Sequence, residues 1–180
     1  MLNNLRIAFL AFIAVGIVSG LTGCASPANR EAMQAAPIAS QHKSPHSVMV
    51  RTSGGGETGA MGSSNIADAD LKAAIEASIT QSGVFGSIVQ GAGGDYELSV
   101  TVIQLSKPLM GFSMTVNMET AWSLIKSSDK SVVLRKSVKS TFTAGMGDAF
   151  AGVTRLRMAV EGAARDSISQ GLNAISELKL

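Results

Sequence analysis

The feature that most constrains the fold of this chain is a long alternation of apolar and polar residues between Tyr96 and Phe142. In its middle segment the apolar set is Phe112, Met114, Val116, Met118, Trp122 and Leu124. A period of two is typical of strands in a sheet with one buried face, because successive side chains point to opposite faces. Turn-forming residues at 107–111 and 127–129 divide the alternation, so it predicts an antiparallel meander of three strands.

Two helical patterns flank this meander. One begins near Asp68 and repeats apolar residues at every fourth position, and the other runs from Val153 to Leu178 in steps of three and four. Gly162 in the second pattern predicts a close approach of this helix to the sheet. With weaker strands at 48–50 and 84–89, the order predicts an α+β two-layer sandwich: a mostly antiparallel sheet of four to five strands with two helices on one face.

The first 23 residues are typical of a bacterial export signal. Residues 7–18 form an uncharged apolar run that is shorter than the roughly 20 residues of a membrane-spanning helix. The tetrad Leu21-Thr22-Gly23-Cys24 resembles the lipobox of bacterial lipoproteins, which implies cleavage between Gly23 and Cys24 and acylation of Cys24. An ordinary signal peptide or an uncleaved anchor helix is the alternative, with the cysteine at that place by chance.

This signal divides the chain into three parts. Residues 1–23 are the leader, residues 24–47 are rich in Pro, Ala and Ser and predict a flexible tether, and residues 48–180 predict one periplasmic domain. Ala25 follows the cysteine where an Asp would retain a lipoprotein at the inner membrane of enteric bacteria. The resemblance to that sorting signal therefore favours the outer membrane over the inner membrane.

Composition and spacing argue against several classes of function. The net charge of +2 is too small to predict a nucleic-acid surface, and a single cysteine excludes a cysteine metal cluster. Residues 54–59 match G-x-G-x-x-G, but the helix begins well after them, so its N-terminus would not meet a pyrophosphate. His42 and His46 lie in the predicted tether, and residues 48–180 contain no histidine for a Ser-His-Asp triad. We expect no enzyme, no cofactor and no metal site.

The loop at 143–152 contains Met146 and Phe150 among glycines. These two apolar residues are either tucked under the final helix or form a recognition tip. A related choice concerns the methionines 110, 114 and 118 with Phe112 and Trp122, which form either ordinary core or an adaptable binding groove.

Arg155 and Arg157 begin a charged face of the final helix. The spacing predicts ion pairs of Glu161 with Arg157 and with Arg165, because residues four apart are neighbours on a helix surface. This face is either solvated or a surface for a partner. Together with Met146 and Phe150, Arg155 and Arg157 are the candidate partner residues.

From Tyr96 onward the chain resembles the YajG family of small outer-membrane lipoproteins. The shared features are a strand ending in Ile103-Gln104-Leu105, an alternating second strand, and a third strand that leads through Gly-Asp-Ala-Phe (147–150) to a long terminal helix. The order of elements is also similar to that of LptE-type and LpoB-type lipoproteins. The resemblance implies no site residue beyond Cys24.

The sequence thus predicts a membrane-anchored periplasmic accessory protein without enzymatic activity. It would be held in the membrane by its N-terminal lipid and would dock to an envelope protein, through its polar sheet face, an exposed edge strand or the loop at 143–152. The alternative is a lipid- or glycan-binding lipoprotein with a pocket on the Met/Phe/Trp face of the sheet. The sequence does not predict an oligomeric state.

Overall fold

The computed structural model describes residues 25–37, 43–59 and 63–180. Its elements are β1 (Ser47–Ser53), α2 (Asp68–Ser82), β2 (Ser87–Ile88), β3 (Tyr96–Ser106), β4 (Met114–Lys126), β5 (Val132–Ala144) and α3 (Gly152–Ser176). This order of strands and helices is the predicted one. Within these ranges, no helix has the length and hydropathy needed to cross a membrane.

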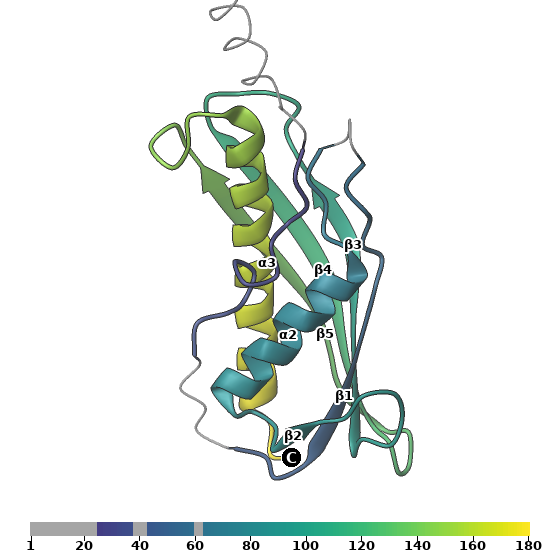
Figure 1. The fold of residues 1–180 in the computed structure, drawn as a ribbon. Coiled ribbons are helices and arrows are strands. Elements are labelled where there is room, and N and C mark those ends of the chain that lie inside the picture. Colours follow the sequence, from purple (N-terminus) through teal and green to yellow (C-terminus); the bar gives the residue numbers. More distant parts are fainter. Residues whose placement is uncertain (1–24, 38–42, 60–62) are drawn as a thin grey trace, which may run out of the picture.

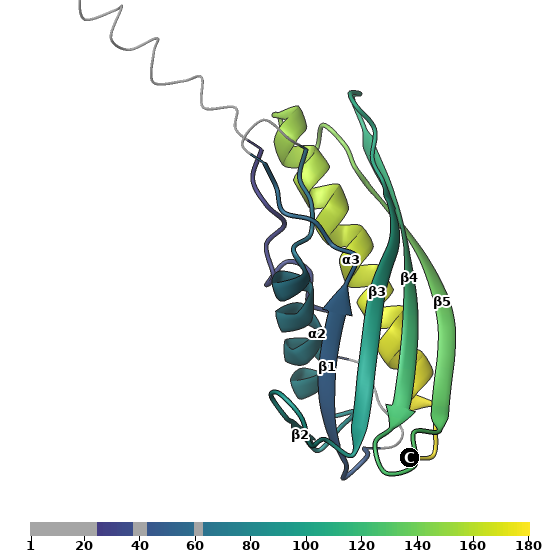
Figure 2. The same cartoon turned by 90° about the vertical axis from the view of Figure 1, so that its right-hand side faces the viewer.

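The strands form one mixed sheet in the order β2-β1-β3-β4-β5. β3, β4 and β5 are antiparallel neighbours, whereas β1 is parallel to both β2 and β3. Both helices cover the same face of this sheet, and the other face is open (Figure 2). The predicted α+β sandwich with a mostly antiparallel sheet is therefore confirmed.

The alternation in β4 becomes the buried face of the sheet because every second side chain points under α3. The buried residues are Met114, Val116, Met118, Thr120, Trp122 and Leu124. Thr120 is the polar member of this row, and its hydroxyl accepts from Trp122 Nε1 at 2.9 Å and lies 2.8 Å from the Ser167 hydroxyl of α3. These hydrogen bonds satisfy the buried polar groups and link the helix to the sheet.

Two glycines let α3 lie directly on the aromatic side chains of the sheet. A Cβ at Gly162 would overlap the Phe142 ring, and a Cβ at Gly171 would overlap the Trp122 ring. Because the alanines at 159, 163 and 164 are also fully buried, the contact surface of α3 is built from small residues. The close approach predicted from Gly162 is confirmed.

The prediction for Phe112 and Met110 is wrong. The alternation places Phe112 on the buried face, and Met110 is grouped with it as core or as part of a binding groove, but the side chains of Phe112 and Met110 are 80% and 84% exposed. The reason is that the pairing of β4 with β5 begins at Met114, opposite Ala144, so the preceding residues belong to a loop.

The chain before β1 also differs from the predicted flexible tether in its described parts, 25–37 and 43–46. Ala28, Met33 and Ala35 are buried in the core, with Met33 fully inaccessible. The Ala35 amide donates to the Ser78 hydroxyl of α2 at 3.0 Å. Figure 1 shows this segment crossing over α3 beside α2. It could not fold alone, but the two helices offer an apolar surface on which it packs.

Candidate functional site

Two loops at one end of the sheet carry most of the large apolar side chains that are exposed in the described chain. The first joins β3 to β4 (107–113) and the second joins β5 to α3 (145–151). They are neighbours because β4 begins opposite the end of β5, and both lie at the upper end in Figure 1. The exposed side chains, here called the apolar loop end, are Leu109, Met110, Phe112, Met146 and Phe150 of the loops and Val153 in the first turn of α3.

The exposure of this loop end is large. Leu109 is 99% exposed and Phe150 is 91% exposed. Single exposed apolar residues that are scattered over a protein surface are ordinary. A cluster of such side chains on adjacent loops marks a surface that binds another apolar surface. The structure thus shows that Met146 and Phe150 are not tucked under α3.

Arg155 holds the two loops together from inside. Its Nη1 donates to the carbonyls of Ala149 and Phe150 at 2.9 and 2.6 Å, and its Nη2 donates to the Gly111 carbonyl at 3.2 Å. The residue is only 6% exposed. Arg155 was a candidate for direct partner contact, but the structure gives it a different position, as a clamp beneath the apolar loop end.

The charged residues of the two loops also bind within the protein. Lys107 Nζ donates to the Ser64 carbonyl at 2.9 Å and to Asn65 Oδ1, and burial lowers the pKa of this amine. Asp148 Oδ2 accepts from the Gly145 amide at 2.7 Å. The outward surface of the two loops is therefore dominated by uncharged side chains.

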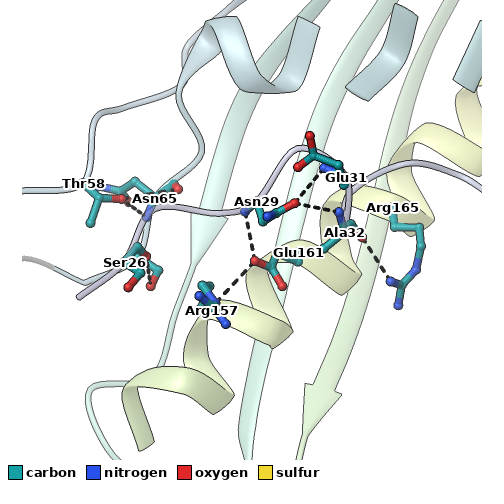
Figure 3. Close-up of polar contacts among 10 residues, drawn as sticks. Ser26, Asn29, Glu31, Ala32, Thr58, Asn65, Arg157, Glu161 and Arg165 are labelled. Atoms are coloured by element: carbon teal, nitrogen blue, oxygen red, sulfur yellow. Dashed lines mark hydrogen bonds and ion pairs between the residues drawn. The ribbon is translucent and has the colours of Figure 1, made fainter. Parts of the chain in front are cut away.

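The charged face of α3 binds the chain's own N-terminal segment (Figure 3). Glu161 Oε1 accepts from the Asn29 amide at 2.9 Å and lies 3.5 Å from Arg157 Nε, which confirms the predicted Arg157–Glu161 pair. Arg165 donates to the Ala32 carbonyl at 3.1 Å and lies over the Phe142 ring, in place of the expected pair with Glu161. This face is therefore neither simply solvated nor free for a partner.

A local signal in the sequence marks the turn that docks on this face. Asn29 Oδ1 accepts from the amides of Glu31 and Ala32 at 2.8 and 3.1 Å, the geometry of an Asx turn. Asn is among the residues that favour such turns, because its side chain can accept from the backbone two residues further on. The composition of the whole segment concealed it, because the surrounding Ala, Ser and Pro residues indicate a disordered chain.

The Met/Phe/Trp face is core rather than the wall of an open pocket. Met114, Met118 and Trp122 are 6%, 2% and 1% exposed, and the Gly171 backbone lies against the Trp122 ring. The opposite face of the sheet carries polar cross-strand contacts, such as Asn117 with Thr141 at 2.8 Å. A shallow hollow on that face is bordered by polar residues of β4 and β5.

The edge of the sheet at β5 is a second candidate surface. β5 has 13 residues and pairs with β4 on one side only. Arg135 and Lys136 are exposed along it. An unpaired edge strand offers backbone donors and acceptors to another extended segment.

His46, Ser47 and Asp95 meet beside the start of β1, although His46 was assigned to the tether. Asp95 Oδ2 accepts from the Ser47 amide and hydroxyl, each at 2.8 Å, and lies 3.7 Å from His46 Nδ1. The hydrogen bonds from Ser47, together with the charge of His46, hold the pKa of Asp95 below its ordinary value. The serine hydroxyl donates to the carboxylate rather than to the imidazole, so the cluster lacks the geometry of a catalytic triad.

The glycine-rich segment after β1 packs against the start of α2. The Gly55 amide donates to Asp68 Oδ1 at 2.8 Å, so a donor that a phosphate would need is already bound. Within the described ranges, no three His, Cys, Asp or Glu side chains gather as a metal site would require. Gly23 and Cys24 lie outside the described residues.

The fold is thus an α+β sandwich with a closed core, an open polar sheet face and an apolar loop end. No protein-family model and no curated protein matches the chain, so the resemblance to the YajG family stays a prediction.

Solved structures with a similar fold exist. Protein XCC0632 from Xanthomonas campestris, described under the family model DUF330, has a TM-score of 0.61 and 16% identity over 79% of this chain and 91% of its own. Hypothetical protein CT253 from Chlamydia trachomatis has a TM-score of 0.52 and 8% identity over 73% of this chain and 98% of its own. At these identities the likeness shows the fold alone.

A minor lipoprotein from Acinetobacter baumannii has a TM-score of 0.45 and 9% identity, over 78% of this chain and 93% of its own. This score is too low to define a common fold.

Proposed function

We propose that this chain is a lipid-anchored accessory protein of the bacterial cell envelope that acts by binding another envelope protein and not by catalysis. Its anchor is Cys24, acylated after cleavage behind Gly23. The support is the complete signal in the sequence: a short apolar run, small residues and a cysteine at the cut. Several acyl chains hold a protein stably on a membrane, because each buried methylene contributes about 0.8 kcal/mol.

The location that fits the signal best is the periplasmic face of the outer membrane. Ala25, at the position that follows the lipidated cysteine, carries no inner-membrane retention signal of the enteric type. Separation of the two membranes of the native host on a density gradient tests this location. Recovery of the chain with inner-membrane markers would contradict it.

The observation that carries the binding role is the bare edge of β5 beside a closed core. The sheet face that could have held a small ligand is sealed by α3, whereas no strand pairs with the outer side of β5. Part of this edge meets α3, since Gln170 Nε2 donates to the Lys139 carbonyl at 3.2 Å. Addition of a strand from a partner would pair these backbone groups. Because Arg135 and Lys136 are exposed on this edge, an extended segment with acidic side chains is the matching chemistry.

Site-specific photo-crosslinking in membranes of the native host tests this role. A crosslinking amino acid at Lys136 is expected to capture one defined envelope protein. The matched control is Ser128, an exposed position in the turn between β4 and β5. Equal adducts from both positions, or none from Lys136, would contradict docking at the β5 edge.

A further inference from the structure

The apolar loop end lies at the same end of the molecule as the first described residues. The Ser26 carbonyl accepts from the Ser64 hydroxyl at 2.8 Å, and the Ser64 carbonyl accepts from Lys107 Nζ at 2.9 Å. These two hydrogen bonds connect the start of the described chain to the base of the loop at 107–113. Figures 1 and 2 agree on this position, since the purple start of the chain and both loops are at the upper end in each view.

The proposed lipid attachment therefore falls beside the apolar loop end. Cys24 is bonded directly to Ala25, and consecutive Cα atoms are about 3.8 Å apart. Ser26 is already fixed to the domain, so little free chain separates the domain from an anchor at Cys24. A domain held this closely must turn one end toward the bilayer, and that end is the one with exposed Leu109, Phe112 and Phe150.

The two ends of the molecule differ in the polarity of their exposed side chains, as contact of one end with a membrane requires. At the apolar loop end, Arg155 is buried and Lys107 is half-buried, and both donate to carbonyl groups within the protein. Asp148 is the exposed charged residue of these two loops, and it accepts from the Gly145 amide, while the large exposed side chains are apolar. At the other end, the turn between β4 and β5 exposes the charged residues Lys126, Asp129 and Lys130. Apolar and aromatic side chains partition into the boundary between headgroups and acyl chains, whereas charged side chains stay in water.

We propose that the apolar loop end inserts into the lipid surface to which Cys24 attaches the chain. Leu109, Met110 and Phe112 enter from one loop, and Met146 and Phe150 enter from the other. Arg155 fixes the two loops relative to each other, so that their tips lie in one surface. Insertion sets the long strands upright on the membrane and leaves the β5 edge open to a partner. This inference rests on the lipid anchor of the proposed function.

Depth-dependent fluorescence quenching of the full-length chain tests the proposal. The acylated Cys24 has no free thiol, and the chain contains no other cysteine, so one introduced cysteine can be labelled selectively. Ser113→Cys and Gly147→Cys place an environment-sensitive dye on each loop and leave all the apolar side chains intact. Ser113 is exposed, and a Cβ at Gly147 meets open space.

The matched control is Ser128→Cys in the turn at the opposite end. β4 has 13 residues, so this turn lies about 40 Å from the loops. Each labelled chain is purified from membranes and reconstituted into vesicles of phosphatidylethanolamine and phosphatidylglycerol that contain doxyl-labelled phosphatidylcholine. We expect the doxyl lipid to quench the dyes at 113 and 147 several-fold more strongly than the dye at 128. Phe112→Ser combined with Phe150→Ser should remove most of this difference.

Flotation of the chain with the vesicles measures attachment through the lipid anchor, and quenching of the dyes measures insertion of the loops. The two proposals can therefore fail separately. A chain that floats with equal quenching at 113, 147 and 128 overturns insertion and leaves the anchor standing. Loop dyes that shift to the blue without doxyl quenching also overturn it, because the loops are then buried against protein, for example a second copy. A chain that does not float contradicts both the anchor and the insertion.

Discussion

Replacement of Gly171 by alanine tests how closely α3 lies on the sheet. The added Cβ would overlap the Trp122 ring, which is 1% exposed and is held by its hydrogen bond to Thr120. Overpacking of a well-packed core costs about 1–3 kcal/mol. We place this site at the upper end of that range, because the ring has no free space and a hydrogen bond opposes its rotation.

The same substitution also stabilises the helix. Alanine is favoured over glycine inside a helix by about 1 kcal/mol. The expected net loss for Gly171→Ala is therefore about 2 kcal/mol in the free energy of unfolding. For a domain of this size, 1 kcal/mol corresponds to about 2–4 °C in Tm, so we expect a fall of about 4–8 °C.

The assay is unfolding of the full chain by urea in detergent, with circular dichroism as the signal. Gly152→Ala is the matched control, because it makes the same change in the same helix and its Cβ would lie 3.5 Å from Met114 Cε, an ordinary contact. We expect the control to be neutral or slightly stabilising. In a double-mutant cycle, Trp122→Phe should reduce the cost of Gly171→Ala.

Equal stability of Gly171→Ala and Gly152→Ala would refute the reasoning. It would mean that space for a methyl group exists between α3 and β4. That space is what a ligand pocket on the Met/Phe/Trp face would need, so the measurement also separates the closed core from the pocket that the sequence left open.

Further predictions concern the N-terminal segment, the loop clamp and an exposed carboxylate. Met33→Ala should lower the free energy of unfolding by about 2–5 kcal/mol, because Met33 is fully buried; a change below 1 kcal/mol would show that the segment is not part of the core. Arg155→Met should cost about 2 kcal/mol and increase proteolysis in the two loops, since it removes three hydrogen bonds from a charged donor. Arg135→Met, at an exposed arginine, should cost less than about 0.5 kcal/mol, and equal effects would contradict the clamp. The lowered pKa of Asp95 stabilises the fold above its ordinary value of 3.8, and this stability is lost as the pH falls through the folded-state pKa. Asp95→Asn should therefore flatten the dependence of Tm on pH below about 4, and an unchanged pH profile would contradict it.

The sheet and its helices were predictable because their signals are local and repeated. The alternation from Tyr96 to Phe142 encodes which side of each strand is buried, and the three- and four-residue steps encode the apolar face of α3. The point where β4 begins was not encoded in the same way. The apolar pattern continues back to Phe112, but the strand begins at Met114, where pairing with β5 becomes possible.

The surfaces were harder to predict, because they depend on contacts distant in sequence. Composition shows whether residues 25–37 can fold alone, but not whether α2 and α3 leave a surface that Met33 can fill. Arg155 sits at a helical position that indicates a solvated charge, and only the tertiary fold brings the Gly111 carbonyl within its reach. The apolar loop end has the same origin, since two separate loops meet there.

The most direct test of the account is the mass of the N-terminal peptide of the chain purified from membranes of its native host. We predict a peptide that begins at Cys24 and carries the added mass of a diacylglyceryl group and an amide-linked acyl chain. In parallel, Cys24→Ala should fold and lose its membrane fractionation. A peptide that retains Gly23, or a Cys24 with a free thiol, would contradict the lipid anchor on which the proposed function rests.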